Sequence, residues 1–233
     1  MAQLKTLLTG KNVSVIGDSI STYRGINNGD AADTTNDTIR NNADCYKDSW
    51  KGGSVTPKDT WWYQAIEQTG MNLLVNNAYS GDKVSSSRFK SGCVNLHDNT
   101  GTASDINPDV IFCYIGINNH SANMTAQDYK SAYDEVIGLM KNKYTNAEIY
   151  LFTLPAHYGV NTTAKIELLD AYNVAIRDLA TTHGCNVVDL ALNSGITATN
   201  SINYTTDNLH PNLIGMDVIT RVLIEKLVED YVA

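Results

Sequence analysis

The sequence predicts an α/β fold in which a parallel five-stranded sheet is covered by helices on both faces. Short apolar runs recur at wide spacing, and each is followed by a polar loop and a longer segment with helical periodicity. The chain has 233 residues, of which 42% are hydrophobic and 18% charged, and it can bury a core without disulfide or metal support. We therefore expect one domain over residues 1–233.

Five apolar runs fit the strands of such a sheet. Strands that are buried on both faces read as continuous hydrophobic runs, without alternation. The predicted strands are Val13–Ile16, Leu73–Val75 with its flanks, Val110–Ile115, Ile149–Leu154 and Asn186–Leu190.

Two intervening segments carry apolar residues at steps of three and four, which places them on one face of a helix. A last helix is expected from about Asn212 to the C-terminus. The two stripes are Tyr129, Ala132, Val136 and Leu139, and Leu169, Tyr172, Ile176 and Leu179; the last helix has Ile219, Val222, Leu223 and Leu227 on its core side.

Two helix starts are marked by capping residues. Thr125 and Asp128 form a predicted capping box, because the threonine oxygen can accept one backbone N–H and the carboxylate another. Residues 56–59 (Thr-Pro-Lys-Asp) repeat this pattern with proline at the first helical position. That box predicts a helix through Trp61, Trp62 and Ile66.

Charge and hydropathy exclude two classes of partner. Seventeen Lys and Arg residues stand against 25 Asp and Glu, for a net charge of -8, and no basic run could neutralise phosphates, so we expect no nucleic-acid partner. No apolar run approaches the about 18 residues that a membrane span needs. Residues 1–11 lack the apolar core of a signal peptide, which leaves the cytoplasm and the exterior after processing both open. The oligomeric state is also open.

The cysteines are too far apart for a zinc ribbon or a redox CxxC motif. Cys113 and Cys185 adjoin apolar runs and are expected to be buried. Cys45 and Cys93 lie in polar segments, where a disulfide between them stays open.

Residues 23–56 form a long polar insertion rich in Asn, Asp and Gly. Loops of this length inside a domain are usually functional or disordered. This one departs from the end of the first predicted strand, and ligands of open parallel sheets bind beyond the carboxyl ends of strands. Whether it forms an ordered lid is open.

Two distant segments predict a catalytic triad. The first strand runs into Gly17, Asp18 and Ser19, a turn of small residues that presents a hydroxyl at the carboxyl edge of the sheet. Asp207 precedes His210 by three residues, where its carboxylate can hold the Nδ1 proton and direct Nε2 outward. Singly, Ser19 also fits a helix cap and His210 a surface residue. Jointly they favour a nucleophile and its base.

Two further strand ends offer hydrogen-bond donors. Gly81 follows the second strand, and its backbone N–H can approach a substrate without a side chain in the way. Residues 116–119 (Gly-Ile-Asn-Asn) follow the third strand and supply amides. Each segment alone is also typical of an ordinary turn.

These four segments, in order, resemble the blocks of the SGNH hydrolases, also called GDSL esterases. Gly17-Asp18-Ser19 resembles the first block, Gly81 the second, residues 116–118 the third, and residues 207–210 (Asp-Asn-Leu-His) the last. The similarity runs from about Val13 to the C-terminus. Asn119 stands where the family usually has Asp, which puts the support of the third loop in question and leaves Asn118 in place.

The resemblance implies a flavodoxin-like three-layer α/β/α fold and a serine esterase that needs no cofactor or metal. It implies that Ser19 is the nucleophile, His210 the general base and then acid, and Asp207 the residue that orients the imidazole. The oxyanion hole would consist of the N–H groups of Ser19 and Gly81 and the side chain of Asn118. Asp18 would belong to the turn, without a catalytic role.

The resemblance and the polar surroundings of the blocks favour a substrate with a small acyl group, preferably acetyl, esterified to a carbohydrate or another small molecule. Members of the family with polar loops are often carbohydrate esterases, and a tryptophan can stack on a sugar ring. The expected substrate contacts are Asp18, Asn119, His120 and Trp50. At least one of Trp61 and Trp62 is expected in the core. The remaining histidines, His97, His157 and His183, are expected in polar loops or at helix ends.

Other interpretations stay open. Within the same chemistry, the substrate could be a short-chain lipid or lysophospholipid ester or a thioester; in another class, the chain could be a non-catalytic glycan-binding domain. A nucleotide- or flavin-binding module is disfavoured because no GxxxxGK[ST] or GxGxxG motif follows a predicted strand. Metal catalysis by Asp18, Asp207 and His210 has no HExxH motif or carboxylate cluster to support it.

Overall fold

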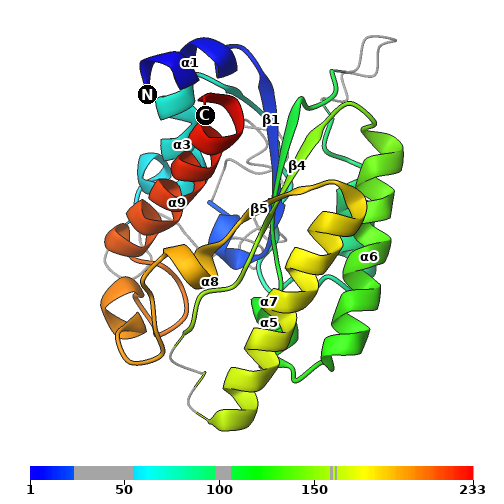
Figure 1. The fold of residues 1–233 in the computed structure, drawn as a ribbon, viewed down its shortest axis with the longest axis vertical. Coiled ribbons are helices and arrows are strands. Elements are labelled where there is room, and N and C mark those ends of the chain that lie inside the picture. The colour runs from blue at the N-terminus through cyan, green and yellow to red at the C-terminus, as the bar shows by residue number, and fades with distance from the viewer. Residues whose placement is uncertain (24–54, 98–105, 158–159, 161, 233) are drawn as a thin grey trace, which may run out of the picture.

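A five-stranded parallel sheet forms the centre of the molecule (Figure 1). The computed structural model describes residues 1–23, 55–97, 106–157, 160 and 162–232. Its strand order, β2-β1-β3-β4-β5, is that of a flavodoxin-like sheet. The strands are β1 (Asn12–Gly17), β2 (Asn72–Asn76), β3 (Val110–Tyr114), β4 (Glu148–Phe152) and β5 (Asn186–Val188).

Helices cover both faces of the sheet, which confirms the predicted three layers. α1, α3 and α9 pack together on one face, whereas α4, α6 and α7 pack on the other (Figure 1). The helices are α1 (Ala2–Leu8), α3 (Trp61–Thr69), α4 (Ser87–Cys93), α5 (Ile117–Ser121), α6 (Ala126–Lys143), α7 (Thr163–His183), α8 (Leu190–Asn193) and α9 (Leu213–Val232), with 3-10 turns η1 (Ser19–Ser21), η4 (Pro57–Asp59) and η5 (Ser201–Tyr204).

All five predicted strands are present, but the last three end earlier than expected, β3 by one residue and β4 and β5 by two. The N–H of Leu154 donates to the side chain of Asn173 on α7, so this residue has left the sheet. Leu190 begins α8, because the Asp189 side chain caps that helix. The apolar residues that follow these strand ends are buried by helices. A hydrophobic run in the sequence does not show which of its residues lie in the strand and which lie beyond it.

The capping boxes are partly as predicted. The N–H of Asp128 donates to Thr125 Oγ1 at the start of α6, but the Asp128 carboxylate accepts the Thr125 hydroxyl and closes the pair through side chains. Residues 56–59 do form a capping box, although it closes the short turn η4, and α3 begins separately at Trp61.

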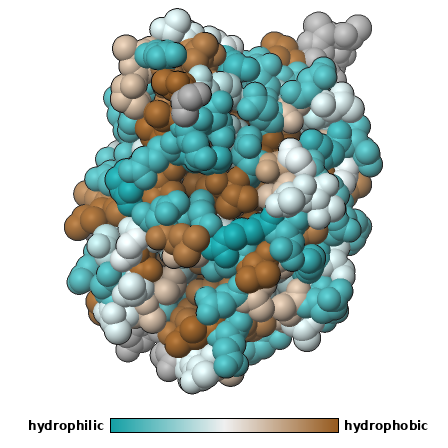
Figure 2. All heavy atoms as spheres, viewed as in Figure 1, coloured by the Kyte–Doolittle hydropathy of each residue, from teal (hydrophilic) through white to brown (hydrophobic). Residues whose placement is uncertain are grey.

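Aromatic side chains fill the core between the sheet and the α3–α9 layer. Trp61 is fully buried and packs on Phe112 and Phe152, with ring centroids 6.0 and 5.0 Å away. Trp62 is fully buried as well, which confirms the expectation that at least one of the two lies in the core. Neither side chain can therefore stack on a sugar ring. The face of the molecule seen in Figure 2 mixes hydrophilic and hydrophobic residues.

Several predictions concern residues that the structure does not describe. Residues 24–54, which include Trp50, Cys45 and nearly all of the polar insertion, lie outside the described ranges.

Cys93 is a free, buried thiol, as is Cys113, whereas the free Cys185 is partly exposed. In the ranges that are described, no helix is both long and apolar enough to cross a membrane.

Candidate active site

The predicted site segments meet because three adjacent strands end at the same edge of the sheet. Ser19 follows β1, Gly81 follows β2 and Asn118 follows β3, and these strands are neighbours in the order β2-β1-β3. The chain direction across the sheet reverses between β1 and β3, where open α/β sheets form their ligand crevice. His210, three residues before α9, lies at the same place.

A chain of two hydrogen bonds joins Ser19, His210 and Asp207. The Ser19 hydroxyl lies 2.9 Å from Nε2 of His210, and Nδ1 of the same ring lies 2.8 Å from Oδ2 of Asp207. A carboxylate only accepts, so Nδ1 carries the proton and Nε2 is left to accept from the hydroxyl. In this arrangement the imidazole can take the serine proton, and the carboxylate can stabilise the resulting charge.

Local backbone structure fixes Asp207 and His210. Thr205 and Pro211 form an isolated antiparallel bridge, and the N–H of Thr206 donates to the carbonyl of His210. Within the loop, Oδ1 of Asp207 accepts the N–H groups of Leu209 and His210 at 3.2 and 2.8 Å. Partial burial alone would raise the pKa of Asp207, but the hydrogen bonds and charge from His210 hold it below its usual value.

The turn that carries Ser19 is tightly packed. A side chain on Gly17 would collide with the carbonyl oxygen of Tyr114 on β3, so only glycine fits there. Asp18 caps η1, with its Oδ1 accepting the N–H of Ile20 at 3.1 Å. Asp18 is 1% exposed, and burial raises its pKa to about 7. This burial corrects the expectation that Asp18 contacts the substrate.

The two donor loops lie against this turn. The N–H of Tyr79 donates to the carbonyl of Gly17, and Gly81 has φ +81°, which a residue with a side chain rarely adopts. Asn118 uses one amide hydrogen to donate to the carbonyl of Asp82 at 3.0 Å, which leaves the other for a ligand. Gly81 is exposed and Asn118 half-buried, so both can reach a substrate.

Asn119 supports the loops from inside. Its side chain is 0% exposed; Oδ1 accepts the N–H of Val84 at 3.0 Å, and Nδ2 donates to the Met124 sulfur at 3.1 Å. The expectation that Asn119 contacts the substrate is therefore wrong. The asparagine does supply loop support at the position where the resembling family usually has aspartate.

His120 is also buried, at 0% exposed, and does not face the substrate as expected. Its Nε2 lies 2.9 Å from the carbonyl of Lys165, so this nitrogen carries the proton, and Nδ1 can accept from Nε2 of His157 at 3.2 Å. Burial lowers the pKa of His120 and brings that of His157 to about 4. His157 lies in the loop after β4, as predicted, although it is only 8% exposed, and His183 ends α7, as predicted.

A small apolar cavity lies among the chain neighbours of the site residues. Its volume is about 30 Å³. Ile20, Ile117 and Leu209 line it, and they adjoin Ser19, Asn118 and His210 in the sequence. In the described part of the chain, no group of three or more His, Cys, Asp or Glu side chains is arranged to hold a metal ion.

One cation beside the site was not predicted from the sequence. Arg88, on the unpredicted helix α4, pairs with the buried carboxylate of Asp82 at 2.7 Å. Its only sequence signal is Ser86, which caps α4 by accepting the N–H of Phe89.

Most of the chain matches a known protein family. Residues 15–218 match the model of the GDSL-like lipase/acylhydrolase family. No curated protein matches the sequence.

Among solved structures, a GDSL-like lipase candidate from Bacteroides ovatus has a TM-score of 0.68 at 20% identity, covering 95% of this chain and 99% of its own. A member of the lipolytic G-D-S-L family from Veillonella parvula has a TM-score of 0.65 at 15% identity, and the match covers 93% of this chain and 97% of that one. A catalytic mutant of an acetylxylan esterase from Geobacillus stearothermophilus has a TM-score of 0.63 at 16% identity, and the match covers 94% of this chain and 95% of that one. At these identities the likeness concerns the fold.

Burial of Asp18 predicts a specific pH dependence of stability. The folded protein keeps the Asp18 proton up to about pH 7, whereas an unfolded chain releases it near its ordinary 3.8. The stability tied to the protonated form is thus complete below about pH 4 and is lost as the pH rises to about 7. Asp18→Asn removes this loss, so the variant's melting temperature relative to wild type should rise across that interval.

Thermal unfolding at pH 4, 5, 6 and 7 measures this difference. Asp170→Asn, which neutralises an exposed carboxylate on α7, is the control and should follow wild type. A difference between Asp18→Asn and wild type that does not change with pH would contradict the assignment.

Proposed function

The chain belongs to the GDSL-like lipase/acylhydrolase family of ester hydrolases. We propose that it is a serine esterase that removes small acyl groups, preferably acetyl, from carbohydrate esters. The observation that carries the proposal is the hydrogen-bond chain from Ser19 through His210 to Asp207, with distances of 2.9 and 2.8 Å.

The reaction proceeds in two halves. His210 Nε2 takes the Ser19 proton as Oγ attacks the ester carbon, and the imidazolium then gives that proton to the leaving alcohol. The acyl group remains on Oγ. Water next attacks the acyl carbon while His210 takes its proton, and return of that proton to Oγ releases the acid. Asp207 stabilises the imidazolium in both halves.

Three donors stabilise the negative charge that develops on the carbonyl oxygen. They are the N–H groups of Ser19 and Gly81 and the second amide hydrogen of Asn118. Because these donors are held by the turns at the strand ends, little reorganisation is needed when the charge forms.

Two observations support a small acyl group. The apolar cavity beside the site has a volume of about 30 Å³, and about 10 to 15 Å³ on this measure holds one water molecule. A cavity of this size suits a methyl or other short acyl group. The similarity to an acetylxylan esterase fits this size and suggests a carbohydrate as the alcohol.

Substitutions at the site should separate the three roles. We expect Asn118→Ala to lower kcat about 100- to 1,000-fold with little change in KM, because the lost donor acts on the developing charge. Ser19→Ala and His210→Ala should each lose at least about 10,000-fold, and the double variant little more than either. Hydrolysis of p-nitrophenyl acetate measures both effects.

Two matched controls are available. Ser21→Ala removes a buried hydroxyl from the same turn, and His183→Ala removes another imidazole paired with a carboxylate, Asp134, at 2.6 Å. Both should keep activity near wild type. Full activity in Ser19→Ala would end the assignment of the nucleophile.

A substrate panel tests the acyl and alcohol parts. We expect kcat/KM to fall steeply from p-nitrophenyl acetate to butyrate and octanoate, because the small apolar cavity suits a short acyl group, and acetate to be released from acetylated oligosaccharides. A preference for octanoate, lysophospholipid or acyl thioesters would overturn the carbohydrate proposal and leave the triad standing. Binding of glycans without any hydrolysis would favour a non-catalytic domain.

A further inference from the structure

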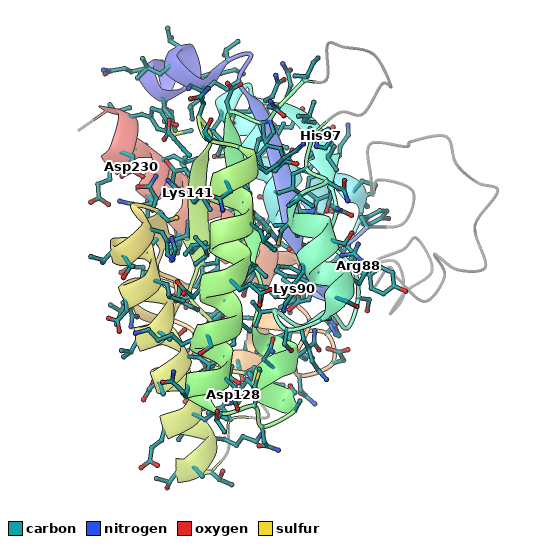
Figure 3. The ribbon with its side chains drawn as sticks, turned by 90° about the vertical axis from the view of Figure 1, so that its right-hand side faces the viewer. Arg88, Lys90, His97, Asp128, Lys141 and Asp230 are labelled. Carbon is teal, nitrogen blue, oxygen red and sulfur yellow. The ribbon has the colours of Figure 1, made fainter. Side chains whose placement is uncertain are left out.

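One side chain outside the proposed site, Arg88, helps to hold the loop that carries Gly81. Arg88 lies on α4, on the flank of the molecule beside α6 (Figure 3). It is half-buried, and no step of the proposed reaction uses it. Its hydrogen bonds nevertheless go to two points in the loop between β2 and α4, one on each side of Gly81.

On the β2 side of Gly81, Arg88 binds Asn77. Nη1 and Nη2 both donate to the Asn77 carbonyl at 3.1 Å, and Nη2 also donates to its side-chain oxygen at 3.2 Å. On the other side of Gly81, Nη1 donates to the Asp82 carboxylate at 2.7 Å. The guanidinium also lies over the ring of Tyr79, 4.6 Å from its centroid. Gly81 lies between these anchors.

Asp82 transmits this restraint to the third loop. Its carbonyl accepts the amide of Asn118 at 3.0 Å, and its carboxylate accepts the Ser86 hydroxyl at 2.9 Å. The backbone at residues 81 and 82 therefore determines where both the Gly81 N–H and the Asn118 amide lie. A shift of Asp82 moves two of the three proposed donors together.

The charge of Arg88 has a second effect. Asp82 is 5% exposed, and burial raises its pKa, an effect that the charge and hydrogen bond of Arg88 oppose. The Asp82 charge also contributes to raising the pKa of Asp18, so the two carboxyl groups interact. An unpaired Asp82 carboxylate would repel the negative charge that forms on the substrate oxygen.

We propose that Arg88 is a positioning residue for the oxyanion hole: it holds residues 77–82 so that Gly81 and Asn118 face the developing oxyanion, and it neutralises Asp82 beside them. This inference rests on the proposed function, since it concerns the rate of the Ser19 reaction. The bridge requires the planar fork of arginine, because a lysine ammonium cannot reach Asn77 and Asp82 in the same geometry.

The test compares Arg88→Lys and Arg88→Met with Arg177→Met. Arg177 is a matched control, because its side chain is also 33% exposed and also binds a carboxylate, Asp189, at 2.7 Å, away from the donor loops. We expect kcat for p-nitrophenyl acetate to fall about 10-fold in Arg88→Lys and about 100-fold in Arg88→Met, since small misplacements of catalytic donors cost this much. KM should stay near wild type, and Arg177→Met should keep its kcat.

A second readout separates positioning from general loss of structure. An alkyl boronic acid forms a tetrahedral adduct with Ser19, so its affinity should fall by about the same factor as kcat/KM. In the Asn118→Ala background, Arg88→Met should cost clearly less than in wild type, because one of the donors that it positions is already gone. If Arg88→Met does not fold, as judged by circular dichroism, Arg88→Lys decides.

Several outcomes overturn the inference. These are a kcat for the Arg88 variants no lower than for Arg177→Met, a loss confined to KM, unchanged boronate affinity, or effects of Arg88 and Asn118 that multiply in full. With Ser19-dependent hydrolysis intact in wild type, each of these removes the role of Arg88 alone. Absence of that hydrolysis in wild type would instead overturn the proposed function, and this inference with it.

Discussion

The site depends on the hydrogen bond between the Ser19 hydroxyl and Nε2 of His210, which joins residues 191 positions apart. No local preference of the chain could bring these atoms together. The parallel sheet does so, because it ends β1 where the loop before α9 crosses the same edge. Each partner is then fixed by its own turn, η1 for the serine and the bridge between Thr205 and Pro211 for the histidine.

Buried polar groups around this bond restrict the surrounding loops. Asn119, Asp18 and Asp82 all lie within or beside the loops and are almost inaccessible to solvent. A buried polar group is costly unless it is hydrogen-bonded, so each of them locks a backbone segment to a partner. The proposed oxyanion donors can thus be exposed and still rigid, because the groups behind them cannot move without losing hydrogen bonds.

The sequence predicted the strands and the four site segments, because continuous apolar runs and short spacings such as that of Asp207 and His210 are local patterns. It missed α1, in which only Leu4 and Leu8 are buried, and α4, which is too short for a clear stripe. It also misplaced Asn119 and His120. Exposure of a loop side chain depends on what packs over it, and that information lies in distant parts of the chain.

The most direct test of the central hydrogen bond is covalent labelling with a fluorophosphonate, in which Oγ displaces fluoride at phosphorus, followed by mass spectrometry of the peptides. We expect a single adduct on the peptide that contains Ser19, formed far more slowly in His210→Ala. An adduct on another residue, or equally fast labelling of His210→Ala, would contradict the account.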